Sequence, residues 1–225
     1  MRRRATGERV RALVAGAVAL GRMARDSVAK ARRALEEGDE VLARRLAEGD
    51  AAVDRAARVL EGEVLAVLAT ASPMAGDMRR VVAVFKALTD LERVGDYAVH
   101  AAAAVAGGWR AEPDLVAMAA EAEAMAGAAT LALGREDARL ARRVMERDGR
   151  VDRLYRRVRR RWEDEAGGET SGGRWLLAAR SLERAADHAV HVAEWAVYAA
   201  VGERPAPAAG EGTARRLGLS SGEAP

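Results

Sequence analysis

The sequence predicts an all-α protein made of two tandem antiparallel three-helix bundles, and three observations support this prediction. Half of the 225 residues are hydrophobic but only 4% are aromatic, a composition typical of helical proteins. Segment 39–55 returns at 137–153 with ten of seventeen positions identical, and 91–100 returns at 182–191. A repeat period of about 90–100 residues is too long for a solenoid unit and indicates a duplicated bundle.

Turn residues place the helices of the first copy. We expect helices at 7–37, 39–71 and 75–106, which are separated by Gly38-Asp39 and by Ser72-Pro73. Asp39 is a good N-cap for the second helix. Along this helix apolar residues recur every seven positions, which predicts long helices packed at shallow angles. These residues are Leu46, Val53, Leu60 and Val67.

The second copy repeats this order. We expect helices at 113–133, 136–166 and 170–202, with Gly134 and Gly167-Gly168 between them. The offset between the copies falls from 98 to 91 residues, a loss of one heptad that preserves the helix faces. The expected organisation is a first bundle at 1–108, a second at 109–203 and a disordered tail rich in Gly, Pro and Ser at 204–225.

Charge and residue content argue against several functions. The formal net charge is only +3, and most arginines are interspersed with acids, as on solvated helix faces. The one dense basic run, at 153–161, is more typical of an exposed helix face, so we expect no nucleic-acid partner. The chain has no cysteine, no signal-peptide pattern and no apolar stretch approaching ~20 uncharged residues. We therefore expect a cytoplasmic protein that reaches the membrane only through partners. A nucleophile elbow, a phosphate loop and a dinucleotide fingerprint are all missing from the sequence, so we expect no enzymatic activity.

Both copies carry carboxylates four residues apart, which lie one turn apart on one helix face. Glu92 and Glu183 are in phase with the apolar stripe of their helices, where an unpaired carboxylate is costly. We expect each bundle to bring two carboxylates of one helix toward two carboxylates and a histidine of a neighbour, as a metal site. The candidate ligands are Asp50, Asp54, Glu92, Asp96 and His100 in the first bundle, and Asp148, Asp152, Glu183, Asp187 and His191 in the second.

Oxygen ligands suit Mg, Ca or Mn, and an added imidazole shifts the preference toward Fe or Zn. His188 has Tyr97 as its counterpart in the other copy, and we expect it to be structural. The alternative is that the acids lie on the surface and pair with arginines. The candidate partners are Arg44, Arg55, Arg58 and Arg79.

At these motifs the chain resembles the PhoU family, the phosphate-specific transport system accessory proteins, over about residues 7–203. The stretch ATASPMAGDMRRVVAVFKALTDLERVGDYAV is similar to the family's Pro-x-x-x-Asp-Leu-Arg turn and Leu-Glu-Arg-(Ile/Val)-Gly-Asp motif. The stretch SLERAADHAVHVAEWAVYAAVGE resembles the corresponding motif near the family's C-terminal end. Where the family commonly has Asn, this chain has His100 and His191.

The resemblance implies a regulator that represses phosphate uptake and phosphate-starvation signalling by contacting the ATPase of the phosphate importer and the sensor histidine kinase. It also implies multinuclear iron or zinc clusters bound by the eight carboxylates of the (Glu/Asp)-x-x-x-Asp motifs. Long amphipathic bundles favour a homodimer. Two alternatives stay open, namely a metal-storage or hydrolytic bundle and an accessory protein of another phosphate or resistance system.

Overall fold

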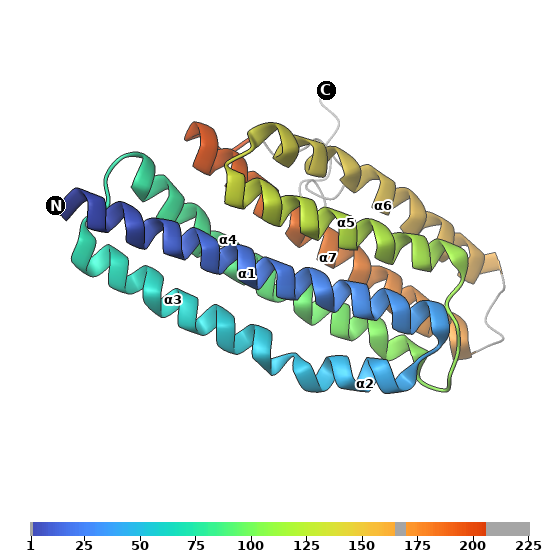
Figure 1. Ribbon diagram of the computed structural model, residues 1–225. Coiled ribbons are helices and arrows are strands. Elements are labelled where there is room, and N and C mark those ends of the chain that lie inside the picture. The colour runs from blue at the N-terminus through green and yellow to red at the C-terminus, as the bar shows by residue number, and fades with distance from the viewer. Residues whose placement is uncertain (1, 165–169, 206–225) are drawn as a thin grey trace, which may run out of the picture.

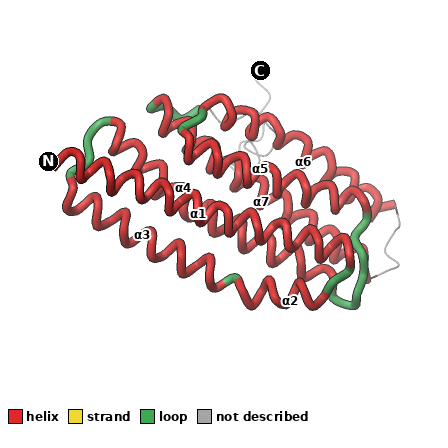
Figure 2. The backbone as a smooth tube through the Cα atoms, in the orientation of Figure 1, coloured by secondary structure: helices red, strands yellow, loops and turns green. Residues whose placement is uncertain are grey.

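The computed structural model describes residues 2–164 and 170–205, which form helices joined by short loops (Figures 1 and 2). The predicted all-α fold is confirmed. The elements are α1 (Arg2–Glu37), α2 (Glu40–Gly49), α3 (Ala51–Ala71), α4 (Gly76–Ala102), the 3₁₀ turn η1 (Ala103–Val105), α5 (Pro113–Arg135), α6 (Ala138–Asp164) and α7 (Thr170–Val201). The predicted disordered tail falls almost entirely on 206–225, outside the described residues.

We predicted a single helix at 39–71, and this prediction is wrong at one point. The segment is divided into α2 and α3 between Gly49 and Ala51. The N–H of Asp50 bonds weakly to the carbonyl of Ala47, at 3.4 Å, and not to the residue four positions back. Gly49 has no side chain to pack and is a poor helix former, so the helix is weakest here. Figure 2 shows the break as a short loop segment between α2 and α3.

Gly134 does not end the fourth predicted helix, and this expectation is also wrong. Helix α5 continues to Arg135 and ends at Glu136, which adopts a left-handed conformation with φ of 52°. A Cβ on Gly134 would lie only 2.6 Å from Cγ2 of Val18 in α1. The glycine therefore serves close packing of α5 against α1, and the turn begins one residue beyond the helix.

Two aspartates at equivalent repeat positions begin the second helix of each copy. Oδ1 of Asp39 accepts a hydrogen bond from the N–H of Leu42, and Oδ1 of Asp137 accepts one from the N–H of Leu140, both at 2.9 Å. Each carboxylate satisfies an N–H that has no partner within its own helix. The predicted N-cap at Asp39 is confirmed, and the second copy reproduces it.

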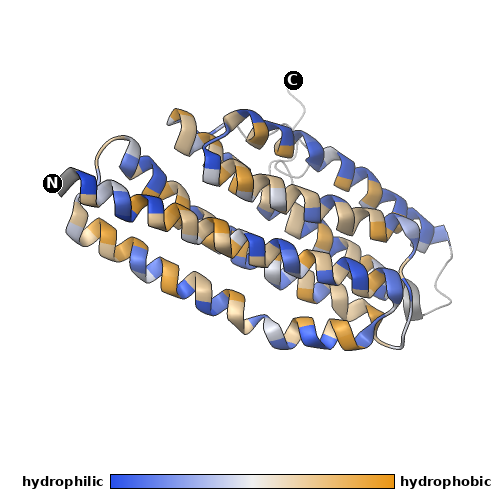
Figure 3. Cartoon of the chain, in the orientation of Figure 1, coloured by the Kyte–Doolittle hydropathy of each residue, from blue (hydrophilic) through white to orange (hydrophobic). Residues whose placement is uncertain are grey.

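Four helices form the centre of the molecule, with α1 and α4 of the first copy packed on α5 and α7 of the second (Figure 1). Helices α2 and α3 cover one side of this centre and α6 covers the other. One continuous hydrophobic core joins both copies, and small alanine side chains let α4 and α7 approach closely. The predicted heptad positions of the second helix are all buried, with at most 5% of each residue exposed. Figure 3 shows hydrophilic residues along most of α6 and apolar residues distributed along the central helices.

Among the described helices, α5 is the one that is long and apolar enough to cross a membrane by length and composition. More than half of its most apolar stretch is buried inside the protein. Leu115, Met118 and Met125 are fully enclosed by neighbouring helices. Burial of this kind is the behaviour of a core helix.

Candidate metal centres

Three of the predicted ligands of the first bundle converge at the break between α2 and α3. Asp50 occupies the break itself, Asp54 lies in the first turn of α3, and Asp96 faces them from α4. Each offers a carboxylate oxygen, and these three oxygens all lie within 4.8 Å of one another. Gly95 of α4 faces the same place, and a Cβ added to it would lie at ordinary contact distances, 3.5 Å from Val53 and 3.9 Å from Oδ1 of Asp50. We call Asp50, Asp54 and Asp96 the first carboxylate cluster.

The charges of the first carboxylate cluster oppose one another. Burial, followed by the negative charges of Asp96 and Asp54, raises the pKa of Asp50, and His100 partly offsets this. Among the described residues, Oδ1 of Asp50 is buried and has no hydrogen-bond donor. A buried anionic oxygen without a donor is costly, and a bound cation would satisfy it. The donor set therefore fits a metal ion.

Glu92 lies beside this cluster but is not a core residue. It is half-buried, whereas Leu91, Val94 and Gly95 of the same helix are buried, so the expectation that it lies in the apolar stripe is wrong. Burial, followed by the charges of Asp54 and Asp96, raises its pKa. His100 is exposed one turn beyond Asp96. A metal-ligand role for Glu92 and His100 stays a prediction.

Two arginines pair with part of the first carboxylate cluster. Arg58 is one of the partners that the alternative interpretation named, whereas Arg93 is not. Arg58 lies 3.7 Å from Asp54, and Arg93 lies 3.2 Å from Asp96. Both guanidinium groups belong to largely exposed side chains, so each pair contributes at most about 1 kcal/mol. Neither pair includes the buried oxygen of Asp50, which has no hydrogen-bond donor among the described residues.

The predicted ligands of the second bundle are less closely gathered. Burial, followed by the charges of Asp187 and Asp152, raises the pKa of Glu183, while Arg184 and Arg180 act in the opposite direction. Asp148 is half-buried one turn before Asp152 on α6. Within residues 2–164 and 170–205, no three of these side chains bring ligand atoms as close together as the first carboxylate cluster does. Their role as a second metal site stays a prediction.

His191 instead faces Asp90 of α4, a residue that was not predicted to belong to a site. Nδ1 of His191 lies 3.2 Å from Oδ1 of Asp90, and Nδ1 of His188 lies 2.9 Å from the same oxygen. The ring of His188 stacks on Tyr97, its counterpart in the other copy, at a centroid distance of 5.6 Å. Burial alone would raise the pKa of Asp90, but the hydrogen bonds and charges of the two histidines outweigh it and lower the pKa.

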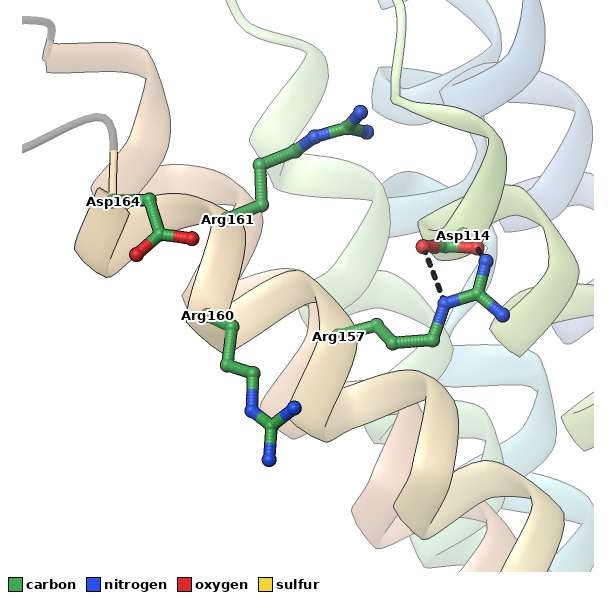
Figure 4. Close-up of a pocket in the computed structure, with 5 residues that line it drawn as sticks. All are labelled: Asp114, Arg157, Arg160, Arg161 and Asp164. Atoms are coloured by element: carbon green, nitrogen blue, oxygen red, sulfur yellow. Dashed lines mark hydrogen bonds and ion pairs between the residues drawn. The ribbon is translucent and has the colours of Figure 1, made fainter.

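A surface cleft lies away from both sets of acids. It has a volume of about 420 Å³ and opens between α5 and the last turns of α6 (Figure 4). Asp114 accepts two hydrogen bonds from Arg157, at 3.0 and 2.5 Å, and Arg161 pairs with Glu112. The predicted exposed face at 153–161 is confirmed here, because the arginines point outward while Leu154 and Val158 are buried.

These features define a class of helical proteins built from two similar three-helix units, with a carboxylate cluster where α2 and α3 of the first unit face α4. The family model described as the PhoU domain matches the chain twice, over residues 18–105 and 115–196. The chain belongs to the PhoU family.

Curated relatives match over most of their length. The Phosphate-specific transport system accessory protein PhoU homolog of Pseudomonas aeruginosa is 31% identical over 193 residues, which cover 80% of this chain and 79% of the relative. The homolog of Deinococcus radiodurans is 33% identical over 164 residues, or 69% and 77% of the two chains.

Solved structures share the same fold. The crystal structure of PhoU from Pseudomonas aeruginosa matches with a TM-score of 0.78 at 29% identity, covering 89% of this chain and 99% of that chain. The phosphate transport system regulatory protein PhoU from Streptococcus pneumoniae matches with a TM-score of 0.83 and the same coverage, at 24% identity.

Proposed function

We propose that this protein is an accessory regulator of phosphate transport that lowers phosphate uptake and phosphate-starvation signalling. The observation that carries the proposal is the match of both three-helix units, in order, to the PhoU domain. The name of each curated relative described above supports the link to phosphate transport. The proposal assigns the protein no catalytic role and places it in the cytoplasm.

In this proposal the protein acts as an adaptor between the ATPase of the phosphate importer and the sensor histidine kinase, as a homodimer. Its long outer helices offer exposed side chains for docking, among them Val59 and Leu65 of α3, each more than half exposed. An adaptor changes signalling only if its partners bind it differently in phosphate-rich and phosphate-poor cells. The proposal therefore requires affinities that depend on phosphate status.

A deletion strain tests the regulatory role. In high phosphate, deletion of the gene should raise alkaline phosphatase activity, and restoring the gene should lower it again. Low activity in the deletion strain would separate the chain from phosphate signalling. Pull-down of the importer ATPase and of the kinase with the full chain then tests the adaptor role separately.

We further propose that the first carboxylate cluster, with Glu92 and His100 beside it, holds a divalent or trivalent cation. Iron or zinc fits a set that includes the histidine, whereas Mg, Ca or Mn fits the oxygens alone. When bound, the cation would supply positive charge that offsets the repulsion between Asp50, Asp54 and Asp96 and would hold α3 against α4. The protein's own contribution is to gather the carboxylates and to keep the oxygen of Asp50 away from solvent.

Metal content tests this site directly. Asp54→Asn combined with Asp96→Asn should lower the metal bound per chain, as measured by elemental analysis after dialysis. Glu48→Gln is a matched control, because it removes one exposed carboxylate of α2 outside the cluster. Equal metal content in all three proteins would overturn the proposed site. If the wild-type protein binds metal but deletion of the gene leaves alkaline phosphatase activity unchanged, the alternative of a metal-storage or hydrolytic bundle is favoured.

A further inference from the structure

The structure assigns a second kind of metal site to the interface between the two repeats. We propose that Asp90, His188 and His191 bind one divalent transition-metal ion of the zinc class. Asp90 belongs to α4 of the first repeat, and the two histidines belong to α7 of the second. The proposal does not depend on the proposed function, and it concerns different side chains from the first carboxylate cluster.

The three side chains present converging ligand atoms. One oxygen of Asp90 and one ring nitrogen of each histidine all lie within 4.8 Å of one another. Tetrahedral zinc, with bonds of about 2.0–2.1 Å, places neighbouring ligand atoms about 3.4 Å apart. The two observed separations between Nδ1 and Oδ1 are 2.9 and 3.2 Å, close to that spacing. An ion would replace the protons that now lie between these atoms.

The rings are held in orientation by their neighbours. His188 and His191 lie three residues apart and therefore on the same face of α7. The ring of His188, on α7, stacks on the ring of Tyr97, on α4, with an angle of 21° between the two planes. The rings of His188 and His191 meet edge to face, with an angle of 88° between their planes. Contacts that fix an imidazole before an ion arrives lower the cost of binding.

The site is partly accessible, which an exchangeable ion requires. The exposed fraction of the side chain is 14% for Asp90, 20% for His188 and 31% for His191. Three protein ligands leave one tetrahedral position for a water molecule. Two imidazoles and one carboxylate favour Zn²⁺, Co²⁺ or Fe²⁺ over Mg²⁺ and Ca²⁺, which prefer oxygen. The two proposed sites therefore differ in the ions that they select.

The three histidines of the chain make a direct test feasible, because the full-length protein should give three sets of imidazole resonances. We expect Zn²⁺ to shift the signals of His188 and His191 together and to saturate at one equivalent for this site. The background protein carries Asp54→Asn and Asp96→Asn, which disable the first carboxylate cluster. His100→Asn in that background identifies the third signal and should leave the zinc response unchanged.

Two further variants separate this site from the acids of the second bundle. Asp90→Asn should abolish the joint shift, whereas Asp152→Asn, on α6, should preserve it. No shift of either ring, a shift of His191 alone, or a response lost in Asp152→Asn but kept in Asp90→Asn would overturn the proposal.

A second measurement tests the proposed site with a variant that is expected to fold normally. His188→Tyr places in the second repeat the residue that the first repeat has at the equivalent position, Tyr97. In the background that carries Asp54→Asn and Asp96→Asn, the visible absorption of Co²⁺ bound to nitrogen ligands should appear, and it should be lost when His188→Tyr is added at unchanged helical content. An unchanged cobalt spectrum in this variant would contradict the proposal.

Discussion

Oδ1 of Asp90 lies 2.9 Å from Nδ1 of His188, so a carboxylate of the first repeat hydrogen-bonds to an imidazole of the second. The same oxygen also meets His191, at 3.2 Å. This contact joins α4 to α7 at the centre of the molecule, where the two repeats share one core. Its energetic contribution can be measured without any metal.

Asp90→Ala should lower the free energy of unfolding of the metal-free protein by about 1–3 kcal/mol, because each of two half-buried imidazoles loses one hydrogen-bond acceptor. Urea denaturation in the presence of a chelator measures this difference. Thr89→Ala, an exposed neighbour on the same helix, should change the stability little. Equal midpoints for Asp90→Ala and the wild type would contradict the prediction.

The metal-free protein should become more stable as the pH falls from neutral toward the ordinary pKa values of 3.8 for Asp and 4.5 for Glu. Asp50, Glu92 and Glu183 have raised pKa values in the folded state, so the folded state binds protons more readily than the unfolded state in this window. Below about pH 4 the lowered pKa of Asp90 has the opposite effect, because protonation then removes a favourable interaction.

Thermal unfolding in chelator at a series of pH values measures this dependence. Combining Asp50→Asn, Glu92→Gln and Glu183→Gln should flatten the rise in stability. Glu48→Gln, which changes an exposed carboxylate, should retain it. A wild-type protein whose stability falls steadily between pH 7 and pH 5 would disprove the assignment.

Two glycines at helix contacts should respond in opposite ways to alanine. A Cβ on Gly21 would lie 2.3 Å from Oγ1 of Thr130, a buried side chain, so Gly21→Ala should destabilise the protein by about 1–3 kcal/mol. Gly95→Ala meets its nearest atom at an ordinary 3.5 Å and should be neutral or stabilising by up to about 1 kcal/mol. Thermal unfolding of both variants tests the contrast, and Thr130→Ala should rescue Gly21→Ala.

The buried carboxylate of Glu121, on α5, forms ion pairs with arginines of α6. Its side chain is 6% exposed and pairs with Arg147, and Arg150 lies 3.5 Å from its second oxygen. Arg147→Met should cost about 2–4 kcal/mol, because it leaves a buried charge only partly compensated. Arg147→Met combined with Glu121→Leu should recover most of this loss in urea denaturation. If the double variant is as unstable as the single one, packing and not charge explains the effect.

The repeats and the heptad pattern were sufficient to predict the fold. Leu46, Val53, Leu60 and Val67 were predicted to face the core, and all four are buried. The break after Gly49 was not predictable, because isolated glycines also lie inside intact helices, as Gly95 and Gly134 do. Whether a glycine interrupts a helix depends on tertiary contacts, which helix propensity alone does not contain.

The candidate site was predicted in part. Spacing along one helix places Asp50 near Asp54, and pairing of helices within a bundle brings Asp96 to them. Spacing could not show that His191 faces Asp90, because that contact depends on how the two repeats pack together. The one signal available was asymmetry, since Asp90 corresponds to Ser181 in the other repeat, where the rest of the motif is largely retained.

That asymmetry has a consequence for how such a molecule can arise. If α4 and α7 came from two identical chains in an isologous dimer, every residue at the contact would occur twice, related by the twofold axis. A carboxylate of one chain that contacts two imidazoles of the other would then be matched by a second, identical contact across the twofold axis. Fusion into one polypeptide removes this constraint, so Asp90 and Ser181 can differ while the helices keep their mutual packing. A symmetric pair would have to carry this heterotypic contact twice, whereas a covalently joined pair can carry it once, with Asp90 in one repeat and Ser181 in the other.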